Sequence, residues 1–157
     1  MIITDKYVFF WNGIYSQWYE SPIHIDGMNF NCCEQYMMYR KALLFHDNDT
    51  AENIMLTSHP RDQKELGRSV KNFDRNQWDS VNFQIVYKAN YYKFTQNQEL
   101  KKELLSTGDR ILVEASPFDK IWGIGLGEKD ENCNDPVKWQ GQNLLGWAIT
   151  LVKQELK

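Results

Sequence analysis

Cysteine is scarce in this chain of 157 residues, which contains only three. Cys32 and Cys33 are adjacent, Cys133 is distant, and no C-x-x-C pair occurs. An odd number without that spacing argues against a disulfide framework and against a structural zinc site. A reducing compartment fits such cysteine usage best, so we expect a cytoplasmic protein.

An excess of basic residues and a long apolar run are also missing. The formal net charge is −3, which argues against a general nucleic-acid binder with a broad basic surface, although a local basic patch stays open. No window approaches the ~20 apolar residues of a membrane-spanning helix. The first residues lack a basic region followed by an apolar stretch, so we expect neither a signal peptide nor a membrane partner.

Familiar motifs of cofactor and metal sites are missing as well. The three histidines, His24, His46 and His59, show no metal-ligand spacing, and no G-x-S-x-G motif occurs. The glycines near residue 125 do not follow the G-x-G-x-x-G dinucleotide pattern. We therefore expect no metal and no resident cofactor.

The composition is that of a globular α+β domain. Hydrophobic residues make up 42% and charged residues 25%, and the length suits a single domain over residues 1–157. Hydrophobic periodicity, capping residues and turn residues predict a helix-rich fold with a small sheet and about six helices. The expected strands are 7–10, a hairpin over 23–30 and 111–115, and the expected helices are 31–46, 49–56, 58–70, 77–95, 99–106 and 142–155.

The segment from Glu114 to Gly127, E-A-S-P-F-D-K-I-W-G-I-G-L-G, is the most informative part of the chain. It follows an apolar strand and places Asp119 three residues before Trp122, between a proline turn and three glycines. Glycine lets a backbone approach another group closely or adopt positive φ. Loops of this kind often carry chemistry, because the scaffold holds them where a ligand can reach them.

A second candidate lies on the expected helix over residues 31–46. Glu34 and Lys41 are seven residues apart, about two helical turns, and so share a face at about 10 Å along the axis. Met37 and Met38 lie between them on that side. The face is either a boundary surface on which Lys41 extends its amine to water, or the wall of a site with one acid and one amine.

The next helix carries basic residues at steps of three, four and three: Arg61, Lys64, Arg68 and Lys71. Such a stripe is either a solvated face or a phosphate-binding surface, since Arg and Lys are the usual donors to phosphate oxygens. Gly67 within this helix indicates close approach of a ligand or of another backbone.

Over almost its whole length the chain resembles the YbiA-like, or NADAR, family. The resemblance rests on the order and spacing of six blocks: C-C-E-Q-Y-M at 32–37 with K-A at 41–42, P-R-D-Q-K-E-L-G-R at 60–68, K-F-T-Q-N at 93–97, L-L-S-T-G-D at 104–109, E-A-S-P-F-D-K-I-W-G-I-G at 114–125 and G-Q-N-L-L-G at 141–146. One block departs from the family, where Leu-Ser-Asn-Phe-Tyr is usual: here the chain reads Tyr15-Ser16-Gln17-Trp18-Tyr19. The departure alters shape and hydrogen bonding at that segment, and so bears on substrate choice.

The resemblance implies hydrolysis of an N-glycosyl bond. Some members cleave the ribose–amine bond of riboflavin-pathway aminopyrimidine ribose phosphates, and others remove ADP-ribose from guanine in nucleic acid. The expected partner is therefore a ribose phosphate or an ADP-ribose-type substrate, free or on nucleic acid. A non-catalytic sensor of ADP-ribose or a related nucleotide is the alternative.

The candidate residues fit this chemistry, because breaking a ribosyl C–N bond builds positive charge at C1. Glu34 and Asp119 are the candidate carboxylates, and Lys41 could attack C1 of an opened sugar or bind phosphate. Further predicted substrate contacts are stacking by Trp122 and Trp18, phosphate binding by Arg68 and Lys64, and a ribose hydrogen bond from Asn143, for which helix capping is the alternative.

Overall fold

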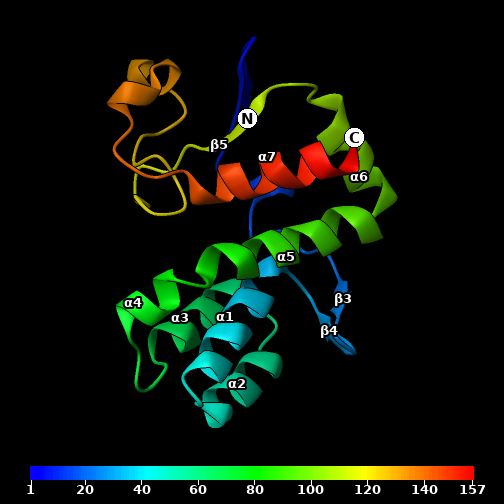
Figure 1. Ribbon diagram of the computed structural model, residues 1–157, viewed down its shortest axis with the longest axis vertical. Coiled ribbons are helices and arrows are strands. Elements are labelled where there is room, and N and C mark those ends of the chain that lie inside the picture. Colours follow the sequence, from blue (N-terminus) through cyan, green and yellow to red (C-terminus); the bar gives the residue numbers. More distant parts are fainter. The chain divides into compact units, whose positions relative to one another are not determined.

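A computed structural model describes residues 1–157, which fold as two compact units. The first unit comprises Met1–Ser16 and Gln98–Lys157, and the second comprises Gln17–Asn97. The elements are seven α-helices, short 3₁₀ turns and two small sheets, which confirms the predicted helix-rich α+β class (Figure 1). That residues 1–157 behave as a single domain stays a prediction.

The first unit is built on a three-stranded sheet of order β1-β2-β5, formed by β1 (Ile2–Ile3), β2 (Tyr7–Phe10) and β5 (Ile111–Glu114). β1 pairs with β2 antiparallel, while β2 and β5 run parallel with Phe10 opposite Glu114. The apolar cluster beside this sheet consists of Phe9, Val113, Ala115, Ile124, Leu126 and Cys133.

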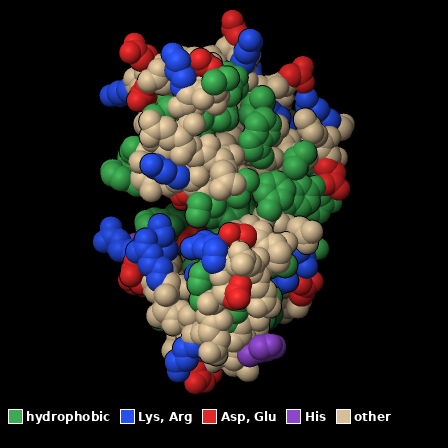
Figure 2. Space-filling model, turned by 60° about the vertical axis from the view of Figure 1, so that its left-hand side comes forward, with side chains coloured by type: hydrophobic (Ala, Val, Ile, Leu, Met, Phe, Trp, Pro, Cys, Tyr) green, Lys and Arg blue, Asp and Glu red, His purple; other side chains and the backbone are tan.

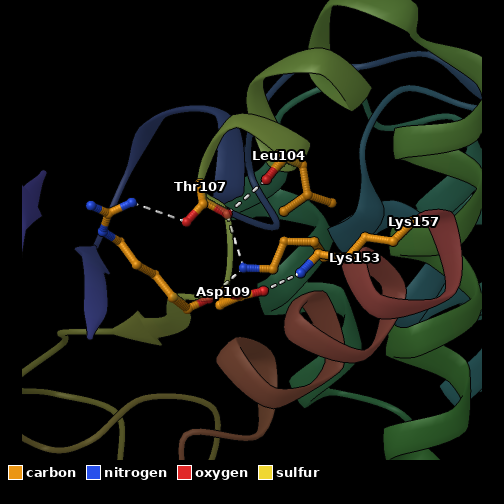
Figure 3. A network of polar contacts seen from close by, with 6 residues as sticks. Leu104, Thr107, Asp109, Lys153 and Lys157 are labelled. Atoms are coloured by element: carbon orange, nitrogen blue, oxygen red, sulfur yellow. Dashed lines mark hydrogen bonds and ion pairs between the residues drawn. The ribbon is translucent and has the colours of Figure 1, made fainter. Parts of the chain in front are cut away.

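Two α-helices and three 3₁₀ turns complete the first unit. They are α6 (Gln98–Ser106), α7 (Leu144–Leu156) and the 3₁₀ turns Gly13–Tyr15, Glu131–Asn134 and Pro136–Lys138. α7 packs against β5, where the hydroxyl of Thr150 accepts a hydrogen bond from the Leu112 N–H at 3.0 Å. Near its end, Lys153 is 1% exposed and its Nζ donates to Thr107 Oγ1 at 2.9 Å and to the Arg110 carbonyl (Figure 3).

The second unit is a helical cluster with a hairpin. In it α1 (Cys33–Leu44) packs against α2 (Asn48–Met55), α3 (Pro60–Arg68) and α5 (Asn82–Gln96), as Figure 1 shows. The predicted hairpin is confirmed as β3 (Ile23–Ile25) and β4 (Met28–Phe30), turned by Asp26 and Gly27 at φ values of 52° and 82°. Asp-Gly suits such a turn because both central residues need positive φ.

The seventh helix, α4 (Arg75–Asp79), corrects the prediction of one continuous helix over 77–95. The hydroxyl of Ser80 donates to the Gln77 carbonyl at 2.7 Å, and Val81 leaves the helical region at φ −127°. This local bond satisfies a carbonyl at the helix end, so the chain breaks there and α5 begins anew at Asn82.

Gly67 on α3 is explained by a side chain rather than by a backbone or ligand. A Cβ at this position would lie 2.0 Å from Sδ of Met38 on α1. With Met38 in this position, the close packing of α3 on α1 leaves no room for a Cβ at residue 67, and a larger residue would displace the methionine side chain.

Candidate active site

Glu34 lies in the first turn of α1 and is only 6% exposed. Its backbone N–H, which has no partner within the helix, donates to the carbonyl of Gln17 at 3.0 Å. A carboxylate in the first turn is favoured by the helix dipole. The helix start therefore carries a buried acid whose backbone is anchored.

The departure from the family block at Gln17 is tied to this helix start. The side-chain carbonyl of Gln17 accepts a hydrogen bond from Asn90 Nδ2 at 2.9 Å, and its Nε2 lies 3.9 Å from Met37 Sδ. Asn90, on α5, is fully buried and also donates to the Val86 carbonyl. Gln17 and Asn90 thus form a polar link next to Glu34 that the sequence analysis did not identify.

Lys41 lies on the same face of α1 as Glu34, as the spacing predicts. Its Nζ is 4.7 Å from the ring centroid of Phe73 and 5.9 Å from that of Trp78. Burial lowers the pKa of Lys41, the positive charge of Arg75 lowers it further, and the charge of Glu34 opposes both. The amine is therefore closer to its neutral, nucleophilic form than an exposed lysine.

The basic stripe is only partly formed as predicted. α3 ends at Arg68, so Lys71 lies outside the helix, and its backbone N–H donates to Asp47 Oδ2 at 3.0 Å. The helix stops early because the Ser69 hydroxyl donates to the Leu66 carbonyl. A helical stripe of all four residues is thus wrong.

The two predicted phosphate ligands of this stripe lie on α3. Lys64 Nζ is 5.9 Å from the ring centroid of Trp18, whose side chain is 39% exposed. Arg68 donates to Glu65 at 2.5 Å and adds a positive charge that lowers the pKa of Lys41. In the second unit, the charges of Glu34 and Arg68 therefore both act on Lys41.

In the first unit Asp119 organises the loop that follows β5. Its Oδ1 accepts hydrogen bonds from the N–H groups of Ile121 at 2.9 Å and Trp122 at 2.8 Å. Trp122 is partly buried, and its carbonyl accepts a bond from the Leu145 N–H at 3.1 Å. Asp119 and Trp122 are thus brought together, with one carboxylate oxygen committed to the loop.

Asn143 is fully buried and joins α7 to β5. Its Oδ1 accepts from the Glu114 N–H at 2.9 Å, and its Nδ2 donates to the Leu112 carbonyl at 3.1 Å. It makes no side-chain bond to the helix, so the capping alternative is wrong, and its φ of 54° moves the helix start from the predicted 142 to Leu144. Binding of a ribose hydroxyl by Asn143 stays a prediction.

Several residues near Lys41 were missed because they are distant in sequence. Phe73 precedes α4, whereas Arg75 and Trp78 lie on it. Only their aromatic and basic composition could have marked them. Lys93 on α5 was also missed: it is fully buried, its Nζ lies 5.4 Å from the Tyr19 ring centroid, and burial lowers its pKa.

Metal-ligating side chains, surface charge and helix length are considered next. No three His, Cys, Asp or Glu side chains lie close enough together to hold a metal ion. The face drawn in Figure 2 carries basic and acidic side chains interspersed with each other. None of the helices is both long and apolar enough to cross a membrane.

Comparison with known proteins identifies one family. The NADAR domain profile matches residues 9–157. An N-glycosidase of Acanthamoeba polyphaga mimivirus is 43% identical over 165 residues, covering 97% of each chain, and N-glycosidase YbiA of Escherichia coli (strain K12) is 31% identical over 92% of this chain and 81% of its own. The NMR structure of E. coli YbiA matches with a TM-score of 0.80 and 29% identity, over 99% of this chain and 87% of that one.

Proposed function

Because this chain belongs to the NADAR family, we propose that it is an N-glycosidase that hydrolyses the C1–N bond of a phosphorylated ribose. The relatives named above carry the name N-glycosidase, which supports hydrolysis of an N-glycosyl bond as the reaction class. The balanced reaction breaks the C1–N bond, joins the oxygen of water to C1 and delivers a proton to the leaving nitrogen.

The buried carboxylate of Glu34 is the observation that carries this proposal. Positive charge grows at C1 as the C–N bond breaks, and a carboxylate in a fixed place stabilises that charge. The Glu34 backbone is anchored by the bond from its N–H to the Gln17 carbonyl, and the residue is 6% exposed. Partial exclusion of water strengthens its interaction with the developing cation.

Two roles are considered for Lys41, which lies on the same face of α1 as Glu34. As a nucleophile, its neutral amine attacks C1 of the opened ribose, the C1–N bond to the leaving amine breaks as that nitrogen takes up a proton, and water then hydrolyses the Lys41 imine to release the sugar and the lysine. As an ammonium, it pairs with Glu34 or with phosphate. The lowered pKa favours the first role, because attack needs the neutral amine.

The remaining predicted contacts divide by chemistry. Arg68 and Lys64, both on α3, suit the substrate phosphate, because guanidinium and ammonium groups donate charge-assisted hydrogen bonds. Trp18, beside Lys64, and Trp122 suit stacking on a base. The substrate is either an aminopyrimidine ribose phosphate of the riboflavin pathway or ADP-ribose attached to guanine in nucleic acid.

Incubation with both substrate classes tests the proposal. The protein and its Glu34→Gln variant are mixed with an aminopyrimidine ribose phosphate or with an oligonucleotide that carries ADP-ribosylated guanine, and products are identified by mass spectrometry. We expect release of ribose 5-phosphate or ADP-ribose by the wild-type protein alone. Tight binding without product from either substrate would instead identify a nucleotide sensor.

A further inference from the structure

Trp11 and Phe118 meet where two parallel strands of the first unit end. Trp11 directly follows β2, and Phe118 lies in the loop after β5. Phe10 is opposite Glu114, and the Ala115 N–H donates to the Phe10 carbonyl at 2.7 Å, so both segments leave the sheet at the same edge. Ligands bind at the carboxyl edge of strands in many α/β sheets.

The two rings contact each other and yet remain open to solvent. Their centroids are 5.8 Å apart with an interplanar angle of 45°, while 83% of Phe118 and 49% of Trp11 is exposed. Single exposed apolar side chains are ordinary, but two large rings in contact form a hydrophobic surface. Burying a Phe side chain stabilises a protein, and at this exposed position most of that gain is lost.

The exposed place of Phe118 is fixed by its loop. Its N–H donates to Ser116 Oγ at 3.3 Å, and the next residue, Asp119, holds two further N–H groups. A Cβ on Gly123 would lie 2.9 Å from the Glu114 carbonyl oxygen, so the loop is packed tightly against the strand end. A ring held outward by a tightly packed loop is prepared to meet a ligand.

We propose that Trp11 and Phe118 form a stacking platform for a nucleobase of the substrate that is not the leaving group. The inference rests on the proposed function and selects between its substrate classes. Phe118 is adjacent in sequence to Asp119 and lies four residues before Trp122, so the platform belongs to the same loop as two candidate residues.

The platform favours a substrate with more than one base. An aminopyrimidine ribose phosphate has one heterocycle, which is lost with the leaving nitrogen. ADP-ribosylated guanine in nucleic acid offers the adenine of ADP-ribose and the bases of the strand. Stacking of a base on an aromatic side chain tolerates any base, because each has a π-face.

Calorimetric titration tests the platform without any need for turnover. Phe118→Ala and Trp11→Ala are compared with Val137→Ala, a control at a 92% exposed apolar side chain of the same unit. The probes are ADP-ribose, a short single-stranded oligonucleotide and ribose 5-phosphate, which has no base. We expect Phe118→Ala to weaken binding of a base-containing probe about 10-fold and to leave ribose 5-phosphate unchanged.

The probes separate the two sources of the base. Weakening for ADP-ribose alone places adenine on the platform, and weakening for the oligonucleotide alone places a base of the strand there. Phe118→Trp should restore affinity and Phe118→Leu should not, because stacking needs a ring. Equal effects on all three probes, or none on any, would overturn the platform, whereas failure of the proposed function would appear as no product from the wild-type protein.

Discussion

Lys153 in the first unit and Lys41 in the second are both withdrawn from water, but their surroundings differ. The ammonium of Lys153 is 1% exposed and donates to the hydroxyl of Thr107 and the carbonyl of Arg110 (Figure 3). Lys41 instead lies over the rings of Phe73 and Trp78 and near the charge of Glu34.

The contrast separates structural from chemical use of a lysine. Fixed oxygen acceptors hold the Lys153 amine in place, so its removal should affect stability. Ring faces and charges leave the lone pair of a neutral Lys41 amine available for reaction. The predictions below test, among other things, whether Lys41 is a reactive group and Lys153 a structural one.

The largest effect is expected from exchanging the Glu34 carboxylate for an amide. Glu34→Gln should reduce turnover by at least ~100-fold, about 2.7 kcal/mol, because Gln keeps the shape but neither carries charge nor transfers a proton. Asp119→Asn is the matched comparison, since its amide oxygen can still accept from Ile121 and Trp122. Steady-state kinetics of both variants, with circular dichroism as the check on folding, give the answer. Turnover near the wild-type value in a folded Glu34→Gln protein would remove Glu34 from the mechanism.

Lys41→Arg distinguishes the two roles of the lysine. Arginine retains the positive charge but is not a nucleophile at neutral pH, so turnover should fall by about 100-fold if an imine forms. Borohydride added during turnover should then leave the wild-type protein heavier by a ribosyl adduct at Lys41, seen by intact-mass and peptide mass spectrometry. An active arginine variant together with an unmodified wild-type mass would assign Lys41 to an ion pair or to phosphate.

Replacing Lys153 or Lys41 by methionine compares what the two lysines contribute to the free energy of unfolding. Lys153→Met should lower the free energy of unfolding by about 2 kcal/mol, because buried acceptors lose a donor. Lys41→Met should lower it by less than about 1 kcal/mol, since the ring faces of Phe73 and Trp78 accept an apolar chain. Urea unfolding followed by fluorescence measures both. Equal losses for the two variants would mean that Lys41 is as structural as Lys153.

Local sequence signals predicted most helices and strands, but not β1, the 3₁₀ turns, the separate α4 or every element end. Asp26-Gly27 determines its hairpin because few residues tolerate two consecutive positive φ values. The break between α4 and α5 depends on one Ser80 hydroxyl, and the start of α7 on the left-handed conformation of Asn143. Hydrophobic periodicity does not reveal features that depend on the hydrogen bond or the backbone conformation of one residue.

In the candidate site, too, the sequence predicts local relations but not contacts between residues that are distant in the chain. Helical spacing placed Glu34 and Lys41 on one face, because that relation is local. The rings around Lys41 and the Gln17–Asn90 link join residues that are far apart in sequence, and only tertiary packing brings them together. Asn143 shows the converse, since its position near a helix start offered side-chain capping as the alternative to a ribose contact, whereas its amide bridges to a strand.

Arg68→Ala tests phosphate recognition in the second unit. We expect about 10-fold weaker binding of a phosphorylated substrate and little change for its dephosphorylated analogue, since charge-assisted bonds contribute about 1.5–3 kcal/mol. Arg61→Ala is the matched control, an exposed arginine on the same helix. Binding constants for both ligands with each variant measure the effect. Equal weakening of both ligands by Arg68→Ala would make this arginine structural and the stripe a solvated face.

The smallest expected effect is a pH dependence of stability that belongs to Lys153. Burial lowers the pKa of Lys153 to about 8 from its ordinary 10.5, with Lys157 and Arg110 lowering it further and Asp109 opposing. Between pH 8 and pH 10.5, Lys153 carries a proton in the unfolded chain but has released it in the folded protein. Stability contributed by this lysine therefore rises with pH across that window and is constant below it.

We expect the wild-type protein to gain about 1 kcal/mol relative to Lys153→Met between pH 8 and pH 9. Urea unfolding at each pH measures the difference, and subtracting the variant removes the titration of all other groups that the two proteins share. Lys41→Met supplies the contrast. Burial also lowers the pKa of Lys41, but the nearby charge of Glu34 opposes the shift. A wild-type advantage that stays flat or falls across this window would show that the hydrogen bonds from Lys153 hold its proton despite burial.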